Sequence, residues 1–183
     1  MGDWEVRLTG SGGPGEQEIL GIASLTRELV ADGAALGWLQ PPEVPEIRDL
    51  LVTITAGIPA GDAAMAVAVR FGAGGEERVA GFGYWRRHQR PTHRPHADLE
   101  RLAVDPAAQG RGLGRTLLST LIAAALRHRV EVLTLDLRGD NSAAAALYKK
   151  VGFHQYGRLE NFVAVGDARY DRLLYALDLR EFR

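Results

Sequence analysis

Hydrophobic residues recur along the chain at two spacings, and each spacing predicts a different element. In residues 131–138 every second position from 133 is leucine, which is typical of a strand that buries one face. In residues 112–128 the apolar positions recur three and four residues apart, which is typical of a helix with one buried side. The two patterns predict strands at 4–8, 63–71, 78–85, 97–105, 131–138, 153–165 and 168–179, and helices at 16–30, 45–57, 112–128 and 142–151.

The order of these elements predicts an α/β fold with a mixed sheet of about seven strands and about four helices. The strand at 97–105, the helix at 112–128 and the strand at 131–138 form a unit whose two strands pair in parallel through a right-handed connection. The glycine-rich residues 72–75 predict a turn that joins the strands on either side into an antiparallel hairpin. Gly81 and Gly83 leave one face of the second hairpin strand bare, which suits the close approach of another element.

Composition narrows the class of protein. With 183 residues, 46% of them hydrophobic, residues 1–183 are expected to form one domain. The 22 Lys and Arg residues are balanced by 23 Asp and Glu residues. The net charge of the chain therefore does not attract it to nucleic acid or to an anionic membrane. There is no cysteine, no apolar run of the roughly 20 residues that span a bilayer, and no signal-peptide pattern. We expect a cytoplasmic protein without disulfides or thiolate metal sites.

Two loops are candidates for a site. Residues 34–44 carry Trp38 and two prolines, and their apolar character predicts a packed loop near a pocket. Residues 86–96 hold four arginines and three histidines, which suits a basic lip, a substrate contact or an ordinary solvated loop. The three histidines, His88, His93 and His96, have no evident acidic partner, and no metal is expected.

A glycine-rich turn, residues 109–114, lies between the strand that stops at Pro106 and the helix that follows. Glycines let the main chain approach a ligand closely, and a helix start offers free N–H groups and a positive dipole end. This is a site for an anion, most plausibly a phosphate. The spacing does not match a dinucleotide fingerprint or a phosphate-binding P-loop, because Arg115 and Gln109 fall where each motif requires glycine.

Two motifs in order resemble the GCN5-related N-acetyltransferase (GNAT) family. Its central motif, [Q/R]-x-x-G-x-[G/A], is matched by Gln109, Gly112 and Gly114. The motif that follows is matched by Asn141, Ala144, Leu147, Tyr148, Gly152 and Phe153. Within the family, Ala31-Asp32-Gly33-Ala34 through Trp38 and Pro41-Pro42 resemble the corresponding stretch of tabtoxin-resistance-type acetyltransferases.

The resemblance implies a GNAT-like fold, with a central parallel strand pair splayed around its co-substrate, acetyl-CoA. The pyrophosphate would lie on N–H groups of residues 109–114, and pantetheine would lie along residues 102–104 like an added strand. A main-chain N–H near Val104 would polarise the thioester carbonyl. The implied contacts are Leu102, Ala103, Val104, Gln109, Gly110, Arg111, Gly112, Leu113, Gly114, Arg115, Thr116, Asn141, Ala144 and Tyr148.

The resemblance also implies acyl transfer to a neutral amine, with Tyr148 as the acid that protonates the departing thiolate. Candidate bases are Asp98, Asp136 and Glu100, and a water chain is the alternative to all three. Strand alternation places Asp98 and Glu100 on one face with Leu102. Glu100 has a second interpretation, as a surface partner of Arg101 or Arg138.

The acceptor stays open between a small-molecule amine and a peptide amine, as does a homodimer. Acidic residues around it would favour a polycation, whereas an apolar slot around Trp38 and Trp85 would favour a small, weakly charged amine. The leading hypothesis is an N-acetyltransferase that works by direct transfer in a ternary complex, because no cysteine could carry the acyl group. A non-catalytic acyl-CoA-binding module is the alternative, and nucleic-acid binding through residues 86–94 is a distant third.

Overall fold

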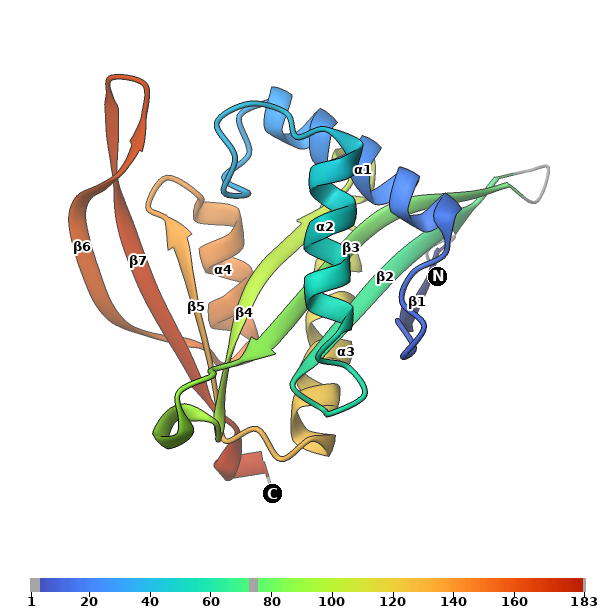
Figure 1. Cartoon of the computed structure of the whole chain (residues 1–183). Coiled ribbons are helices and arrows are strands. Elements are labelled where there is room, and N and C mark those ends of the chain that lie inside the picture. The colour runs from blue at the N-terminus through green and yellow to red at the C-terminus, as the bar shows by residue number, and fades with distance from the viewer. Residues whose placement is uncertain (1–3, 73–75, 183) are drawn as a thin grey trace.

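The computed structural model describes residues 4–72 and 76–182, which form one mixed sheet with helices on both faces (Figure 1). Within these ranges the sheet has seven strands in the order β1-β2-β3-β4-β5-β7-β6. The strands are β1 Trp4–Leu8, β2 Ala63–Phe71, β3 Glu77–Arg87, β4 His96–Val104, β5 Val132–Arg138, β6 His154–Val165 and β7 Ala168–Asp178. The helices are α1 Glu16–Ala31, α2 Val44–Thr55, α3 Leu113–Arg127 and α4 Ser142–Val151.

The sheet has the predicted connectivity. β2 and β3 pair antiparallel, although residues 73–75 of the predicted turn lie outside the described residues. β4 and β5 are parallel, and α3 is the helix that connects them. All other neighbouring pairs in the described sheet are antiparallel. The predicted fold class is therefore confirmed.

The helices divide the core into two layers. α1 and α2 pack against β3 and β2 and, as Figure 1 shows, cross in front of the sheet, while α3 lies behind it. Alternate β3 residues supply the two cores: Phe82 and Tyr84 pack toward α1 and α2, and Trp85 packs toward α3. The Trp85 indole N–H donates to the Leu121 carbonyl of α3 at 3.0 Å, which satisfies its buried polar atom. A β4 side chain can therefore be assigned to a face by its β3 neighbours. Phe82 and Tyr84 mark the face covered by α1 and α2, and Trp85 marks the face covered by α3.

The bare face at Gly81 and Gly83 is occupied as predicted. A Cβ on Gly81 would lie 2.8 Å from the Ala103 carbonyl oxygen and 2.9 Å from Leu117 Cδ1. A Cβ on Gly83 would lie 2.9 Å from Leu102 Cδ1 and 3.0 Å from Leu121 Cδ1. These distances are shorter than ordinary carbon contacts, so the two glycines let α3 and β4 lie close to β3.

The basic loop after β3 is mostly structural. Arg87 is largely buried and donates to the carbonyls of Gly61, Arg94 and His128, and burial lowers its pKa. Arg94 binds the Asp62 carboxylate at 2.6 Å, and Arg86 binds Glu100. Three of the four arginines therefore hold neighbouring segments together instead of forming a free basic lip.

No helix in the described part of the chain is long and apolar enough to cross a membrane.

Candidate active site

The parallel strands β4 and β5 separate shortly after they begin to pair. Their register runs from His96 opposite Val132 to Asp98 opposite Thr134 and then stops. Beyond that point a cavity of about 160 Å³ opens between the strands, and we call it the β4–β5 groove. Its lining includes seven of the residues implied as coenzyme contacts, namely Leu102, Ala103, Val104, Gln109, Asn141, Ala144 and Tyr148.

The main chain of β4 presents polar groups along this groove. The Gln109 side-chain amide donates to the Val104 carbonyl at 3.3 Å, whereas the N–H of the next residue, Asp105, bonds to Ala80 on β3. The Val104 carbonyl is therefore directed away from β3. In an antiparallel ladder a residue's N–H and carbonyl point to the same edge, so the Val104 N–H also faces the groove.

The glycine-rich turn adopts the shape expected of an anion site. Gly110 has φ 72° and Gly112 has φ 91°, left-handed values that side chains disfavour, and Gly112 is the N-cap of α3. The first N–H of α3 to find a main-chain partner belongs to Thr116, which donates to the Gly112 carbonyl at 3.0 Å. Within the described residues, the N–H groups of 110–115 have no hydrogen bond, and the helix dipole adds positive potential there. The Arg111 guanidinium lies 5.0 Å from the centre of the Trp4 ring.

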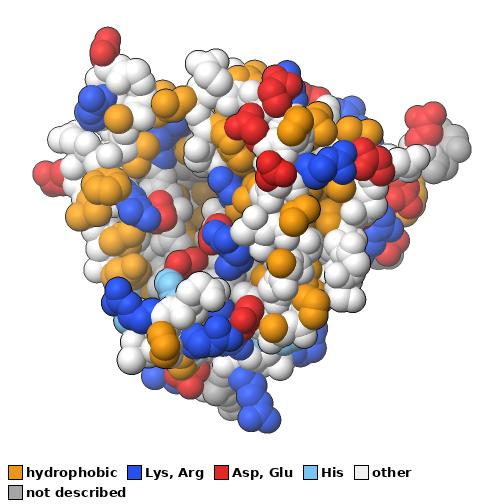
Figure 2. Space-filling model, in the orientation of Figure 1, with side chains coloured by type: hydrophobic (Ala, Val, Ile, Leu, Met, Phe, Trp, Pro, Cys, Tyr) orange, Lys and Arg blue, Asp and Glu red, His pale blue; other side chains and the backbone are white. Residues whose placement is uncertain are grey.

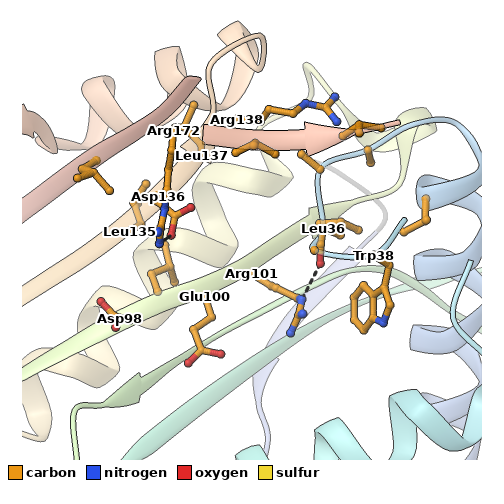
Figure 3. Close-up of a pocket in the computed structure, with 18 of the residues that line it drawn as sticks. Leu36, Trp38, Asp98, Glu100, Arg101, Leu135, Asp136, Leu137, Arg138 and Arg172 are labelled. Atoms are coloured by element: carbon orange, nitrogen blue, oxygen red, sulfur yellow. Dashed lines mark hydrogen bonds and ion pairs between the residues drawn. The ribbon is translucent and has the colours of Figure 1, made fainter. Parts of the chain in front are cut away.

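A β-bulge at Glu100 redirects the side chains of β4. Trp85 pairs with Leu99 and Tyr84 pairs with Arg101, so Glu100 is an extra residue in the ladder. Glu100 and Arg101, although consecutive, both extend to the same side of the strand (Figure 3). Leu102 instead packs with Leu99 in the core on the α3 side. The predicted shared face of Asp98 and Glu100 is confirmed, but the inclusion of Leu102 is wrong because the bulge resets the alternation.

The three candidate carboxylates line one larger cavity of about 670 Å³, which we call the open cavity. Glu100 accepts two hydrogen bonds from Arg86, at 2.7 and 2.9 Å, so its predicted partners Arg101 and Arg138 are wrong. Asp136 is paired with Arg172 at 2.7 Å.

Asp98 has weaker partners than the other two carboxylates. It accepts a hydrogen bond from the Thr134 hydroxyl and lies 3.5 Å from His88 Nδ1. The expectation that His88 lacks an acidic partner is therefore wrong, because this contact depends on the β3–β4 register.

The open cavity lies between the β6–β7 hairpin and the C-terminal end of α1 with the loop that follows it, where Figure 2 shows a hollow edged by acidic and basic side chains. The packed loop predicted at 34–44 forms one wall, through Leu36, Trp38 and Leu39. The apolar slot around Trp38 and Trp85 that would favour a small, weakly charged amine does not form, because Trp85 is fully buried on the opposite face of the sheet. The charged residues that line both cavities mark where the cavities meet, and they are Glu100, Arg101, Asp136 and Arg138.

Tyr148 reaches the β4–β5 groove from α4. Asn141 caps this helix by accepting from the Ala144 N–H at 3.1 Å, and Gly152 ends it with φ 111°. The Tyr148 ring is 8% exposed and packs edge-on against Phe153, with ring centroids 5.6 Å apart. Burial raises the pKa of its phenol well above the ordinary value, so the hydroxyl stays protonated at neutral pH.

The histidines of the loop after β3 are not arranged as metal ligands. His88 and His93 pack edge-on with ring centroids 6.0 Å apart, and the Nδ1 atom of His96 is buried without a hydrogen bond. Across residues 4–72 and 76–182, no three His, Asp or Glu side chains form a group that could hold a metal ion.

Residues 34–153 match the Acetyltransferase (GNAT) family, and the chain therefore belongs to it. The [ribosomal protein bS18]-alanine N-acetyltransferase of Escherichia coli strain K12 is 40% identical over 83 residues, covering 45% of this chain and 56% of that protein. N-alpha-acetyltransferase RimI of Mycobacterium tuberculosis is 44% identical over 71 residues, covering 39% and 43%. This chain thus spans about half the length of the curated relatives it matches.

Solved structures share the fold over almost the whole chain. An N-acetyltransferase from Staphylococcus aureus Mu50 superposes with a TM-score of 0.79 at 21% identity, covering 96% of this chain and 98% of that one. A GNAT phosphinothricin acetyltransferase from Sinorhizobium meliloti, in complex with acetyl-CoA, superposes with a TM-score of 0.77 at 20% identity, covering 96% and 88%. At such identities the likeness establishes the fold.

Proposed function

We propose that the protein is an N-acetyltransferase that transfers the acetyl group of acetyl-CoA to a primary amine. The observation that carries this proposal is the continuity of the site. The β4–β5 groove runs from the side of the free N–H groups at the start of α3 to the open cavity, and Glu100, Arg101 and Asp136 line the junction. Such a passage can hold a long anionic donor while an amine arrives from the opposite side.

Acetyl-CoA would bind with its pyrophosphate on the N–H groups of residues 110–115, where the helix dipole favours negative charge. Arg115 and Thr116 lie on the first turn of α3 and can add contacts to the phosphates. Pantetheine would extend along residues 102–104 and bond to the edge of β4 that β5 leaves open. In this pose the Val104 N–H is a donor for the amide groups of pantetheine or for the thioester carbonyl.

In the proposed reaction, the amine nitrogen attacks the thioester carbon and the C–S bond breaks. The departing sulfur takes a proton from the Tyr148 hydroxyl, which the raised pKa keeps available as an acid. The amine nitrogen loses one proton as the amide forms. Direct transfer is favoured because the chain has no cysteine to form an acyl-thioester intermediate.

We assign Asp136 as the group that accepts the amine proton. Asp136 and Glu100 both lie at the junction, whereas Asp98 lines only the open cavity. Glu100 is held by two hydrogen bonds from Arg86, and Asp136 by one ion pair that is exposed to solvent. Asp98 and the water around it can pass the proton onward from Asp136.

A calorimetric titration of the whole chain with acetyl-CoA, followed by a thiol-release assay with a panel of amines, tests the function. Binding at or below tens of micromolar and amine-dependent thiol release are expected. The absence of acetyl-CoA binding would refute the proposal. Binding without thiol release for any amine would instead favour a non-catalytic acyl-CoA-binding module.

A further inference from the structure

Three arginines line the open cavity, and their charges are compensated differently. Arg138 is paired with Asp140 at 2.6 Å, and Arg172 is paired with Asp136 at 2.7 Å. Arg101 bonds to neutral oxygens, donating to the Leu36 carbonyl at 2.9 Å and to the Tyr84 hydroxyl. Among the described residues, no carboxylate forms an ion pair with Arg101, so it is the arginine of this cavity that has no direct counter-ion.

The neutral partners of Arg101 hold it in one place without satisfying its charge. Its guanidinium lies 4.2 Å from the centre of the Trp38 ring, and Figure 3 shows the two side chains next to each other. Tyr84 does not act as a counter-ion, because burial raises its pKa to about 12 and the phenol stays neutral. Nε and Nη1 each have a partner, so the N–H groups on Nη2 are available to a ligand.

The position of Arg101 specifies where a ligand anion would lie. Arg101 lines both the β4–β5 groove and the open cavity, as do Glu100, Asp136 and the paired Arg138. An anion bound to Arg101 would therefore lie beside the point where the amine meets the thioester. A guanidinium presents a planar set of donors that matches the geometry of a carboxylate.

We propose that the acceptor is a free amino acid, whose carboxylate binds Arg101 while its amine reaches the thioester; this rests on the proposed function. In an α-amino acid the two groups are separated by one carbon, which agrees with the position of Arg101 at the junction. The apolar walls formed by Trp38, Leu39 and Val163 offer a surface for the side chain of the amino acid. A peptide N-terminus has an amide where the amino acid has its carboxylate and gives Arg101 no counter-charge.

The test measures kcat/KM for acetyl transfer to the standard L-amino acids and to their carboxamides. We expect at least one amino acid to be preferred over its own carboxamide. In Arg101→Gln this acid-to-amide ratio is expected to fall roughly 10- to 100-fold, the range for loss of a charged hydrogen bond. The comparison of ratios removes the difference in basicity between the two kinds of amine.

The control variant is Arg138→Gln. It removes an arginine from the same cavity, but one whose charge Asp140 already compensates. Its acid-to-amide ratio is expected to match that of the wild type. Titration of each variant with acetyl-CoA measures whether the β4–β5 groove and the turn at residues 109–114 still bind the acetyl donor. If Arg101→Gln does not fold, the acid-to-amide ratio is measured on Arg101→Lys instead. This variant keeps the charge but not the planar donors.

Three results would overturn the inference while leaving the proposed function in place. The first is turnover of carboxamides or peptides in preference to every free amino acid. The second is an acid-to-amide ratio that does not change when Arg101 is replaced. The third is failure of the wild type to acetylate any amino acid while acetyl-CoA binding is intact. Loss of acetyl-CoA binding in the wild type would refute the proposed function itself.

Discussion

The candidate site has a donor side, formed by the β4–β5 groove and the turn at residues 109–114, and an acceptor side, formed by the open cavity. The two sides use different kinds of chemical group. On the donor side, the main-chain groups come from the edge of β4 and from the turn at residues 109–114, which are almost continuous in sequence. The open cavity uses side chains from five separate stretches, which lie between Val30 and Leu39, Asp98 and Arg101, Thr134 and Arg138, Tyr156 and Val165, and Arg172 and Leu174. The first side needs glycines and strand geometry, and the second needs particular charges brought together by the fold.

This difference implies that the two sides respond to substitution in different ways. Main-chain donors persist when most side chains change, so the donor side is sensitive mainly to changes that move or strain the backbone. On the acceptor side, the ion pairs of Glu100 and Asp136 each join two strands, as Arg172 on β7 pairs with Asp136 on β5. A single substitution there leaves a charge without its partner.

The largest effect is expected from Tyr148→Phe, which tests whether chemistry on the donor side can be separated from binding. We expect kcat to fall by roughly 10²- to 10⁴-fold, because the thiolate loses its acid, while acetyl-CoA affinity stays nearly unchanged. Steady-state kinetics and calorimetry measure the two quantities. The matched control is Tyr170→Phe on β7, outside both cavities, for which kcat should equal that of the wild type. A wild-type kcat in Tyr148→Phe would remove Tyr148 from the mechanism.

The pH dependence provides an independent test of Tyr148. An ordinary tyrosine has a pKa of about 10 and would lose its proton, and its function as an acid, above that pH. Burial raises the pKa of Tyr148, so the acid form persists at higher pH. The kcat of the wild type is expected to stay level through about pH 10, and a fall centred there would contradict the assignment.

Asp136→Asn is expected to have the next largest effect and tests the acceptor side. We expect kcat/KM to fall by about 10²-fold at neutral pH, the lower end for a general base, because water in the exposed cavity accepts the proton instead. The loss should shrink as pH rises, since hydroxide in the exposed cavity can then accept the proton in place of Asp136. Glu100→Gln serves as the comparison, with a smaller loss expected. Equal pH profiles for Asp136→Asn and the wild type would exclude Asp136 as the base.

The smallest effect is expected from Gly81→Ala, which asks whether a change in packing reaches one side alone. The new Cβ would lie 2.8 Å from the Ala103 carbonyl oxygen and 3.5 Å from the Val104 Cα. We expect the free energy of unfolding to fall by about 1–3 kcal/mol, and acetyl-CoA affinity to fall because residues 103 and 104 must shift. Gly12→Ala, whose Cβ would meet no atom within 4 Å, is the control. Denaturant unfolding measures the free energy of unfolding, and calorimetry measures the acetyl-CoA affinity. An unchanged free energy of unfolding would show that β4 moves freely.

Much of the donor side was predictable from sequence because its determinants are local. The stop of β4 at Pro106 and the glycines before α3 specify a strand end, a turn and a helix start within a short stretch of sequence. The approach of α3 to Gly81 could also be predicted, because two glycines on one face of a strand have few other uses. The role of each residue toward coenzyme A stays a prediction.

The acceptor side was less predictable because it depends on register and long-range pairing. Nothing in the residues of β4 signals that Glu100 is an extra residue, so simple alternation placed Leu102 on the wrong face. The pairing of Glu100 with Arg86 follows from that bulge, as does the position of Arg101. The face of Trp85 could not be predicted for a related reason: an aromatic residue on a strand can face either layer, and only the core packing decides which.

The bulge at Glu100 also affects how relatives should be aligned with this chain. Counting back in twos from the glycine turn gives the correct face as far as Leu102 and the wrong face beyond it. A relative that lacks the extra residue would need a gap of one position at Glu100 before its acidic residues could be compared with Asp98. Deleting Glu100 would be more severe than any substitution there, because either Asp98 or Arg101 would then turn toward α3. Phylogenetic comparison of acceptor residues in this family therefore depends on placing a single-residue insertion.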